Sequence, residues 1–470
     1  MLPFFSIVLT GKLPFHHVMM HGVVCDSQGK KMSKSKGNVV DPLHVINGRS
    51  LKELEEDLKL TGQALMNEKE MQKALKSLKA TFPSGIPMCG TDALRFSLVH
   101  NDPKSQQLNV DVNFIYTCAA FCNKIWQAAR FFLLAHERLQ EVETHHISEV
   151  EKMSNLAWLH LNHGKLRLED KWILSKYATT VKEVNENLEK RDFHLAVRAL
   201  RSFLYSDLCD VYVEASKPSL IDVYNQDFKV KYTVLKICLM DSLKLLHPIM
   251  PFITEELYQR ILIKTTLDAC KDIQESIMIA NYPNFKDWEL FESKSITNDM
   301  NCILEIVSNI RSNKKLFNLK RSINPSILTV FDDSTQNINF SDHEMMIEMQ
   351  KIISVLSPCG NVKMIQKGEF VTNGTPDYEN VVNNWWKSDV PSYECIVYLD
   401  PANFIDAKEE LNKISSQRNK ALDKFENMKR KKEKQNDTPS EAEIDLFNRD
   451  MRLLNDRECF LRKIQEKIDK

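Results

Sequence analysis

The chain has 470 residues, which is too many for one hydrophobic core, and its apolar content of 43% is ordinary for a globular protein. Glycine is scarce at 12 residues, which favours helices over glycine-rich sheet folds. The formal net charge of −1 excludes a global positive field, so a nucleic-acid partner would have to meet local basic patches. The sequence has no apolar run of transmembrane length and no secretory signal, so we expect no membrane partner.

The 11 cysteines are scattered along the chain, and none has the spacing of zinc ligands. We therefore predict no protein-bound metal. Cys118 and Cys122 fall on a helical pattern of apolar residues, which predicts that they pack in a core. Free thiols suit a reducing compartment such as the cytosol or the mitochondrial matrix.

Residues 1–48 combine a predicted strand, a lysine-rich loop and a helix start. The run Val18–Val24 is nearly all apolar and predicts a strand that is buried on both faces. After a turn at Asp26–Gly29 and the loop, Asp41 is expected to cap a helix whose first residue is Pro42. The loop is therefore expected to lie between a strand and a helix start, which is a plausible place for a phosphate site.

The loop itself reads Lys31-Met32-Ser33-Lys34-Ser35. Two ammonium groups on a loop can hold a polyphosphate and follow its charge during a reaction, and hydroxyls and backbone N–H groups add neutral donors. The plain alternative is a basic surface turn.

A second phosphate motif, the P-loop, can be tested on the same segment. The glycine before Gly29-Lys30 is Gly22, which gives the wrong spacing, and Lys31 stands where Ser or Thr is required. We therefore reject a P-loop.

Residues 49–110 are predicted to form a helical connector. Ser50 and Glu53 have the spacing of a capping box, and Thr91 is expected to cap a helix. The predicted helices are Ser50–Leu60, Asn67–Ala80 and Asp92–His100.

Residues 111–296 repeat apolar positions at three- and four-residue steps, which predicts a bundle of long helices with short connections. The aromatic residues Trp172, Phe203 and Tyr212 have helical core spacing, so packing is favoured over base stacking. The expected helices begin near Asp111 and continue over Asp170–Lys190, Phe193–Ser216, Phe228–Leu246 and Thr254–Ile263.

Residues 297–400 predict a small α/β unit with a basic helix, Asn301–Lys315, followed by three short strands. The segment Arg311–Arg321 is the densest basic cluster outside the chain ends. It is either a solvated face or a contact surface for an RNA backbone. The predicted strands are Ser326–Phe331, Asn361–Ile365 and Glu394–Leu399, and the candidate contacts are Arg311, Lys314 and Lys315.

Residues 406–470 predict two helices, each with one narrow apolar seam, as in an antiparallel coiled coil. The turn zone between them is marked by Pro439 and by a basic run. This hairpin either binds RNA or dimerises the protein. The basic run consists of Lys429, Arg430, Lys431 and Lys432.

The lysine loop resembles the KMSKS signature of class I aminoacyl-tRNA synthetases, which it matches without substitution. Gly11–Phe15 resembles the valyl, isoleucyl and leucyl group. The runs Phe82–Phe96, Leu208–Tyr212 and His247–Leu257 are more similar to the valyl-tRNA synthetases, as is the basic helical hairpin at the end. The similarity is weakest between about residues 266 and 392.

The resemblance implies a ligase that activates valine with ATP and Mg²⁺ and transfers it to tRNA-Val. Lys34 matches the second signature lysine and is expected to be the main ligand of the ATP phosphates, with Lys31 second. Met32 is expected to anchor the loop, and the serines are expected to donate hydrogen bonds. The expected ATP-binding residues are Lys31, Met32, Ser33, Lys34 and Ser35, together with His21 and Gly22 near the end of the strand.

The resemblance also implies an architecture. The chain is expected to be mostly α, with residues 1–48 as a remnant of a doubly wound nucleotide-binding fold and 111–296 as the anticodon-binding domain. Residues 49–110 would form the connector, in which the segment Thr91–Arg95 would contact the inner side of the tRNA, and the hairpin of residues 406–470 would meet its corner. We expect a monomer in the cytosol, with a mitochondrial form as the other possibility.

Two family features have no counterpart in the sequence. The His-x-Gly-His motif is absent, since His160-Leu161-Asn162-His163 has Asn in place of Gly and follows the loop, and no editing domain is present. We therefore expect this chain to be a C-terminal portion that does not charge tRNA by itself. The alternatives are a non-catalytic tRNA-binding or scaffold protein and an isoleucyl- or leucyl-tRNA synthetase fragment.

Overall fold

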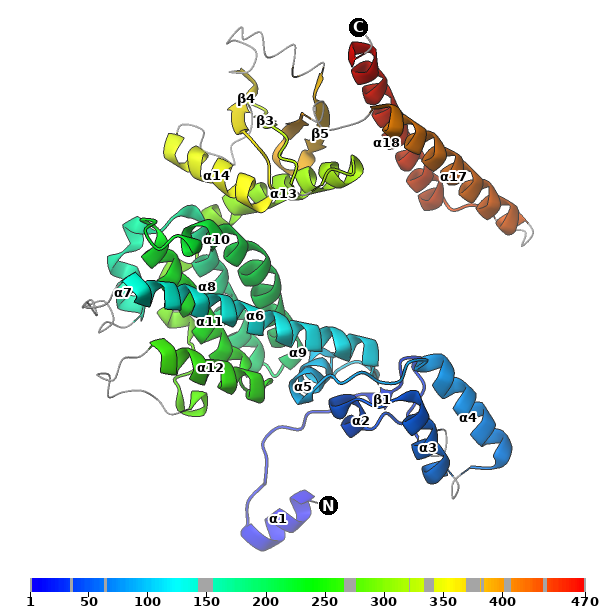
Figure 1. The fold of residues 1–470 in the computed structure, drawn as a ribbon. Helices are drawn as coiled ribbons and strands as arrows, with labels where there is room; N and C mark the ends of the chain where they lie inside the picture. The colour runs from blue at the N-terminus through cyan, green and yellow to red at the C-terminus, as the bar shows by residue number, and fades with distance from the viewer. Residues whose placement is uncertain are drawn as a thin grey trace. The chain divides into compact units, whose positions relative to one another are not determined.

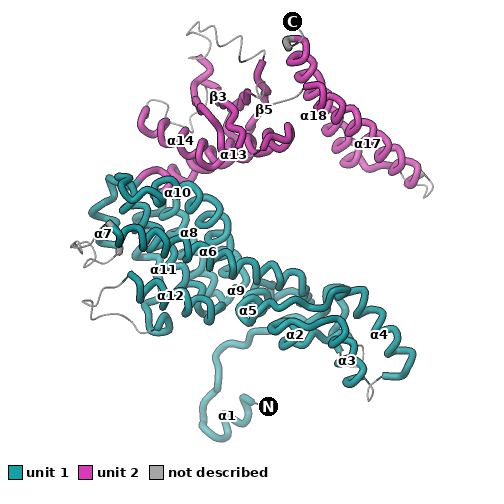
Figure 2. Tube along the Cα trace, viewed as in Figure 1, with its two compact units in different colours: residues 1–166, 170–293 teal, residues 167–169, 294–470 magenta. Residues whose placement is uncertain are grey.

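The computed structural model describes residues 2–33, 37–62, 66–142, 155–265, 276–320, 322–333, 342–368, 381, 384–400, 407–433 and 438–468. These residues are mostly helical, which confirms the expected fold class. The chain divides into two compact units (Figure 2). Unit 1 contains residues 1–166 and 170–293, and unit 2 contains residues 167–169 and 294–470.

Unit 1 begins with helix α1 (Leu2–Thr10), which has no buried residue, and strand β1 (Val23–Cys25). β1 pairs in parallel with β2 (Gln107–Asn109). The prediction of a buried strand over Val18–Val24 is therefore wrong in extent and in burial, since Val18 is 72% exposed and Val23 is 48% exposed. A sheet of two short strands does not cover both faces of an apolar strand.

The connector consists of α2 (Pro42–Asn47), α3 (Leu51–Gly62), α4 (Glu68–Thr81) and α5 (Thr91–His100). The Asp41 cap, with Pro42 following it, and the Ser50–Glu53 capping box are confirmed. The predicted Thr91 cap is wrong, because Gly90, at a φ of 83°, occupies the cap position and Thr91 is the first helical residue.

The helical domain of unit 1 is built around the long helix α6, which packs against α5, α11 and α12 (Figure 1). Trp172, Phe203 and Tyr212 are at most 1% exposed, so the prediction that they pack in the core is confirmed. The helices are α6 (Val112–Val142), α7 (Asn155–Leu161), α8 (Leu168–Glu189), α9 (Phe193–Arg201), a π-helix (Ser202–Tyr212), α10 (Val213–Ile221), α11 (Phe228–Leu246) and α12 (Pro251–Thr265).

Unit 2 contains a four-stranded sheet with the order β4-β3-β6-β5 and two helices that pack against it (Figure 1). β3 pairs in parallel with β4 and antiparallel with β6. The three predicted strands are present, whereas β5 and α14 were not predicted. The elements are α13 (Lys294–Leu316), β3 (Ile327–Phe331), α14 (His343–Leu356), β4 (Val362–Gln366), β5 (Trp386–Val390) and β6 (Cys395–Leu399).

The C-terminal part of unit 2 is an antiparallel helical pair, α17 (Ala407–Glu433) and α18 (Glu441–Ile468), as expected. Ile414 and Leu461 are fully buried between the helices, and the rings of Phe425 and Phe447 stack 4.1 Å apart nearer the turn. Among the helices that the structure describes, none is long and apolar enough to cross a membrane.

Candidate functional site

The lysine loop is held at both ends by a pair of side chains, Asp26 and Asn38. The Asp26 carboxylate accepts hydrogen bonds from the backbone N–H groups of Gln28 and Lys30, at 3.0 and 2.9 Å, and from the Asn38 side chain at 2.9 Å. The Asn38 amide oxygen in turn accepts from the backbone N–H of Ser33 at 3.0 Å. The loop is therefore tied together at its base.

This arrangement also stabilises the charged form of Asp26. Partial burial alone would raise the pKa of its carboxyl group, but the hydrogen bonds from Asn38, Lys30 and Gln28 lower it below its usual value. Sequence reasoning treated Asp26 only as a turn residue and missed Asn38. The signal was an amide next to Gly37, because Asn side chains readily bond to nearby backbone.

Of the predicted phosphate ligands, Lys31 is exposed, and Met32 and Ser33 are half-buried. The backbone N–H of Met32 donates to the carbonyl oxygen of Val24 at 3.3 Å, so the start of the loop runs along β1. Lys34 and Ser35 lie outside the described residues.

His21 and Gly22 lie just before β1. The His21 ring is exposed, and its Nδ1 lies 2.8 Å from the carbonyl oxygen of Gly22. Gly22 approaches the chain before β2 so closely that a Cβ atom there would lie 2.2 Å from the carbonyl oxygen of Ser105. Gly22 therefore has a packing reason for its identity that is independent of a nucleotide.

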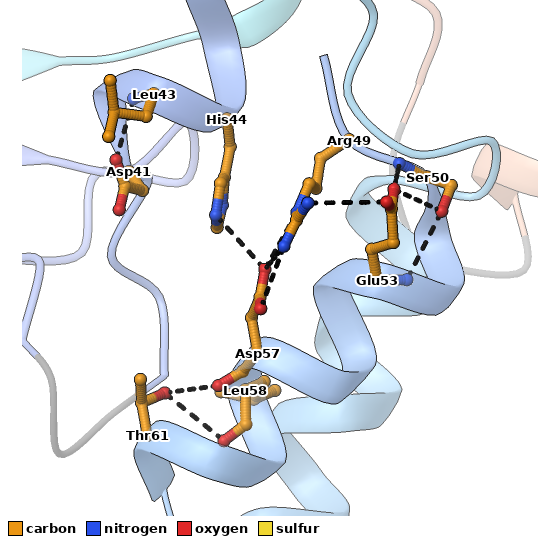
Figure 3. Close-up of polar contacts among 9 residues, drawn as sticks. All are labelled: Asp41, Leu43, His44, Arg49, Ser50, Glu53, Asp57, Leu58 and Thr61. Atoms are coloured by element: carbon orange, nitrogen blue, oxygen red, sulfur yellow. Dashed lines mark hydrogen bonds and ion pairs between the residues drawn. The ribbon is translucent and has the colours of Figure 1, made fainter. Parts of the chain in front are cut away.

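A polar cluster attaches α2, the helix after the loop, to α3 (Figure 3). The Asp57 carboxylate accepts two hydrogen bonds from Arg49, at 3.1 and 3.2 Å, and lies 3.2 Å from Nε2 of His44 (Figure 3). The bond from Arg49 lowers the pKa of Asp57, and Asp57 raises the pKa of Arg49. Asp57 of α3 therefore holds α2 through His44 and the residue after its C-cap through Arg49.

A cavity of about 480 Å³ lies between the residues that flank the lysine loop, α4 and the start of α6. Its lining is mixed, with charged side chains such as Lys30, Glu70 and Lys73 beside apolar ones such as Leu78 and Val112. The chain on either side of the lysine loop, including Asp26 and Asn38, therefore borders open space.

The predicted basic contact surface of α13 is largely engaged within unit 2. The Lys314 ammonium donates to the carbonyl oxygens of Ile323 and Pro358, at 2.7 and 2.6 Å, and the residue is 8% exposed. Burial lowers the pKa of Lys314. The Lys314 ammonium is thus engaged by backbone carbonyl groups within unit 2, which leaves little of its charge accessible, and its contact with RNA stays a prediction.

The two other candidates on α13 differ. Arg311 is exposed, but its Nε and one terminal nitrogen donate to the carbonyl oxygen of Leu356, at 3.2 and 2.6 Å. Lys315 is exposed, and its contact with RNA stays a prediction. Arg321 lies outside the described residues.

The basic run at the end of α17 is mostly accessible. Lys429, Arg430 and Lys431 are exposed, and Arg430 lies 3.6 Å from Glu426. Lys432 is half-buried and donates to Glu443 of α18 at 2.5 Å, so it joins the two helices. The accessible positive charge of the run is therefore carried by the first three residues.

Two family models match the chain, and together they cover more than half of it. Residues 1–111 match "tRNA synthetases class I (I, L, M and V)", and residues 170–329 match "Anticodon-binding domain of tRNA ligase". The first match contains the lysine loop and the connector, and the second contains most of the helical domain.

The chain is also similar to individual proteins. It is 32% identical to a valine–tRNA ligase of Caenorhabditis elegans over 88% of this chain and 36% of that protein. It is 34% identical to a probable mitochondrial valine–tRNA ligase of Dictyostelium discoideum over 74% of this chain and 34% of that protein. It is 31% identical to a valine–tRNA ligase of Mus musculus over 98% of this chain and 33% of that protein.

The chain spans about a third of the length of these relatives. Since one match contains the lysine loop and the connector and the other contains most of the helical domain, the chain belongs to the class I aminoacyl-tRNA synthetases, and along its length it is similar to valine–tRNA ligases.

Proposed function

We propose that this chain provides the KMSKS loop and the tRNA-binding body of a valine–tRNA ligase, which makes valyl-tRNA, AMP and pyrophosphate from ATP, valine and tRNA-Val. The observation that carries the proposal is the unsubstituted Lys31–Ser35 signature within a chain that is similar to valine–tRNA ligases over 88% to 98% of its residues in two relatives. The hydrogen bond between Asn38 and Asp26 also supports the proposal. It ties the base of the loop together, which suits a loop that must bring positive charge to a defined place.

In this proposal the loop acts on the phosphates of ATP, which enters as its Mg²⁺ complex. Lys34 is the main ligand and Lys31 the second, and their ammonium groups stabilise the charge that develops on the α-phosphate and the leaving pyrophosphate. The hydroxyl groups of Ser33 and Ser35 donate hydrogen bonds. The reaction needs no covalent enzyme intermediate, so the chain's contribution is positioning and charge.

The test is Lys34→Ala in a complete enzyme that contains this chain, assayed by ATP–pyrophosphate exchange. We expect the exchange rate to fall by about two to three orders of magnitude, with tRNA binding unchanged, because a charge contact to the transition state is lost. Lys52→Ala, an exposed lysine on α3, is the matched control. An exchange rate of Lys34→Ala within about twofold of wild type would contradict the assignment.

The tRNA partner follows from the helical domain and from the basic hairpin of α17 and α18. We propose that the hairpin contacts the tRNA backbone through Lys429, Arg430 and Lys431, which are exposed. Deletion of residues 406–470 should weaken tRNA-Val binding in a gel-shift assay. Unchanged affinity would reject this role and would favour a hairpin that dimerises the protein. Sedimentation of the chain with and without residues 406–470 would then show a dimer only for the intact chain.

The sequence has no His-x-Gly-His motif, so we propose that the 470-residue chain by itself binds tRNA as a monomer but does not charge it. Aminoacylation by the purified chain would refute this point. If an immunoblot shows that the native protein has the size of this chain alone, the alternative function, tRNA binding without catalysis, is favoured. We expect the protein in the cytosol, and cell fractionation tests this against the mitochondrial location that one relative's name gives.

A further inference from the structure

Helix α5 holds the turn between α11 and α12 through two charged side chains. The first is Asp92, which is 8% exposed. Its carboxylate oxygens accept from the backbone N–H groups of Phe252 and Ile253, at 3.3 and 2.7 Å. These groups belong to the first turn of α12, where unpaired N–H groups and the helix dipole favour a negative charge.

The second side chain is Arg95, one turn further along α5. Its Nε donates to the carbonyl oxygen of Ile249 at 2.9 Å, and a terminal nitrogen donates to that of Pro248 at 3.1 Å. These carbonyl groups follow directly on the C-terminus of α11, where a positive charge is favoured. The two side chains of α5 therefore bind the two helix ends that meet in this turn, Arg95 at the C-terminus of α11 and Asp92 at the N-terminus of α12. These partners lie more than 150 residues away along the sequence.

The start of α5 is joined in the same way to α2, the helix that follows the lysine loop. The backbone N–H groups of Cys89 and Gly90 donate to the carbonyl oxygens of Val45 and Ile46, at 3.0 and 3.2 Å. The two backbones touch, since a Cβ atom at Gly48 would lie 2.9 Å from the nitrogen of Met88. Hydrogen bonds therefore connect the loop's helix to α5 and α5 to the helical domain, all within unit 1.

We infer that Asp92 and Arg95 are positioning residues for the transfer of the amino acid to tRNA. They fix the helical domain, which carries the tRNA, at one distance and direction from the lysine loop, which works on ATP. This inference rests on the proposed function. Of the parts that this chain supplies, the activation step uses only the loop, whereas the transfer step needs the loop and the helical domain in register. Loosening the clamp, which is the set of hydrogen bonds from Asp92 and Arg95 to the turn between α11 and α12, therefore separates the two rates.

The experiment compares Asp92→Ala, Arg95→Ala and the conservative Asp92→Asn with wild type in a complete enzyme that contains this chain. For the two alanine variants we expect kcat/KM for tRNA in aminoacylation to fall at least about tenfold, while ATP–pyrophosphate exchange stays within about twofold of wild type. Asp92→Asn keeps an oxygen that can accept from the N-terminus of α12, so it should recover most of the transfer rate.

Tyr212→Phe is the matched control for general loosening, because it removes a buried hydrogen bond to Asp170 in the same domain without touching the clamp. An equal fall of exchange and transfer in the alanine variants, an unchanged transfer rate, or the same split of rates in Tyr212→Phe would overturn the inference. A failure of the proposed function is distinguishable, because wild type itself would then show no exchange. Hydrogen exchange of residues 248–256 in the 470-residue chain gives a readout without activity, and Asp92→Ala should speed it while Tyr212→Phe should not.

Discussion

Arg457 of α18 donates a charged hydrogen bond to Glu410 of α17, and both residues are almost fully buried, at 2% and 5% exposure. The Arg457 guanidinium also lies 5.4 Å from the centre of the Phe317 ring, and Asn318 donates to Glu410 at 3.5 Å. The base of the helical pair is thereby attached to the end of α13 by charge as well as by the apolar cluster that includes Trp386.

Breaking this ion pair from one side should destabilise unit 2 strongly. Arg457→Met removes the buried guanidinium from the Glu410 carboxylate, which keeps only the half-exposed Lys413 at 3.0 Å and Asn318, and we expect a loss of about 3 kcal/mol in the free energy of unfolding. The double variant Arg457→Met/Glu410→Leu removes both charges and should lose clearly less. Urea unfolding followed by circular dichroism measures the free energies of unfolding of the double variant and of the single variants Arg457→Met and Glu410→Leu. If the effects of the two single changes simply add up in the double variant, the pairing is contradicted.

A second buried ion pair lies in the core of the helical domain. Asp170 accepts from Lys231 at 3.0 Å and from the Tyr212 hydroxyl at 2.8 Å, and the two charged residues are at most 2% exposed. Lys231→Met should cost about 3–5 kcal/mol in the free energy of unfolding of unit 1, because a carboxylate stays buried. Lys217→Met, whose partner Glu214 is on the surface, is the control and should cost at most about 0.5 kcal/mol. Equal costs in a denaturant titration would show that the buried pair has no special weight.

Unit 1 should lose stability in mild acid because of His100. Burial, together with the nearby charges of Arg198 and Arg201, lowers the pKa of His100 from 6.5 to about 4. Between these values the unfolded chain binds a proton that the folded chain does not, so stability falls as the pH falls from about 6.5 towards 4. His100→Phe, which keeps a ring between Phe96 and Phe114, removes this term.

The measurement is the midpoint of thermal unfolding at pH 7.5 and at pH 5. We expect the wild-type midpoint to drop more between the two values than that of His100→Phe. The control is His160→Phe, since exposed His160 also lies beside an aromatic ring, that of Phe291 at 5.2 Å. Parallel pH curves for wild type and His100→Phe would rule out His100 as the source.

The hairpin tip should contribute to the salt dependence of tRNA binding. Each phosphate contact made by a lysine adds about 0.7–0.9 to the slope of log K against log salt. Lys429→Gln/Lys431→Gln should therefore reduce the slope by about one to two. The control Lys351→Gln/Lys363→Gln removes two exposed charges from α14 and β4 and should leave the slope unchanged. Equal slopes for both double variants would remove the tip from the contact surface.

Where the deciding interaction is local, the sequence was sufficient to predict the structure. The Asp41 cap and the Ser50–Glu53 box depend only on residues within three positions of each other, and both are confirmed. The same holds for Trp172 and Tyr212, because helical spacing already indicates which side of a helix is apolar.

Where a distant partner decides, the sequence was not sufficient. The Val18–Val24 run was expected to be buried, but burial depends on which neighbours cover it. Lys314 reads as a surface cation until the carbonyl groups of Ile323 and Pro358 are seen to surround its ammonium. β5 has the sequence Trp-Lys-Ser-Asp-Val, whose polar centre is unfavourable for a strand and is overridden by pairing with β6.

Because the C-terminal hairpin is attached at its base, a small rotation there moves its tip over a larger distance. An α-helix rises about 1.5 Å per residue, so Glu441 at the tip lies about 30 Å from Leu461 at the base. A tilt of about 10° at the base would carry the tip about 5 Å, which is more than the length of a hydrogen bond. The tight packing around Arg457 at the base therefore determines how precisely Lys429 and Lys431 near the tip are positioned.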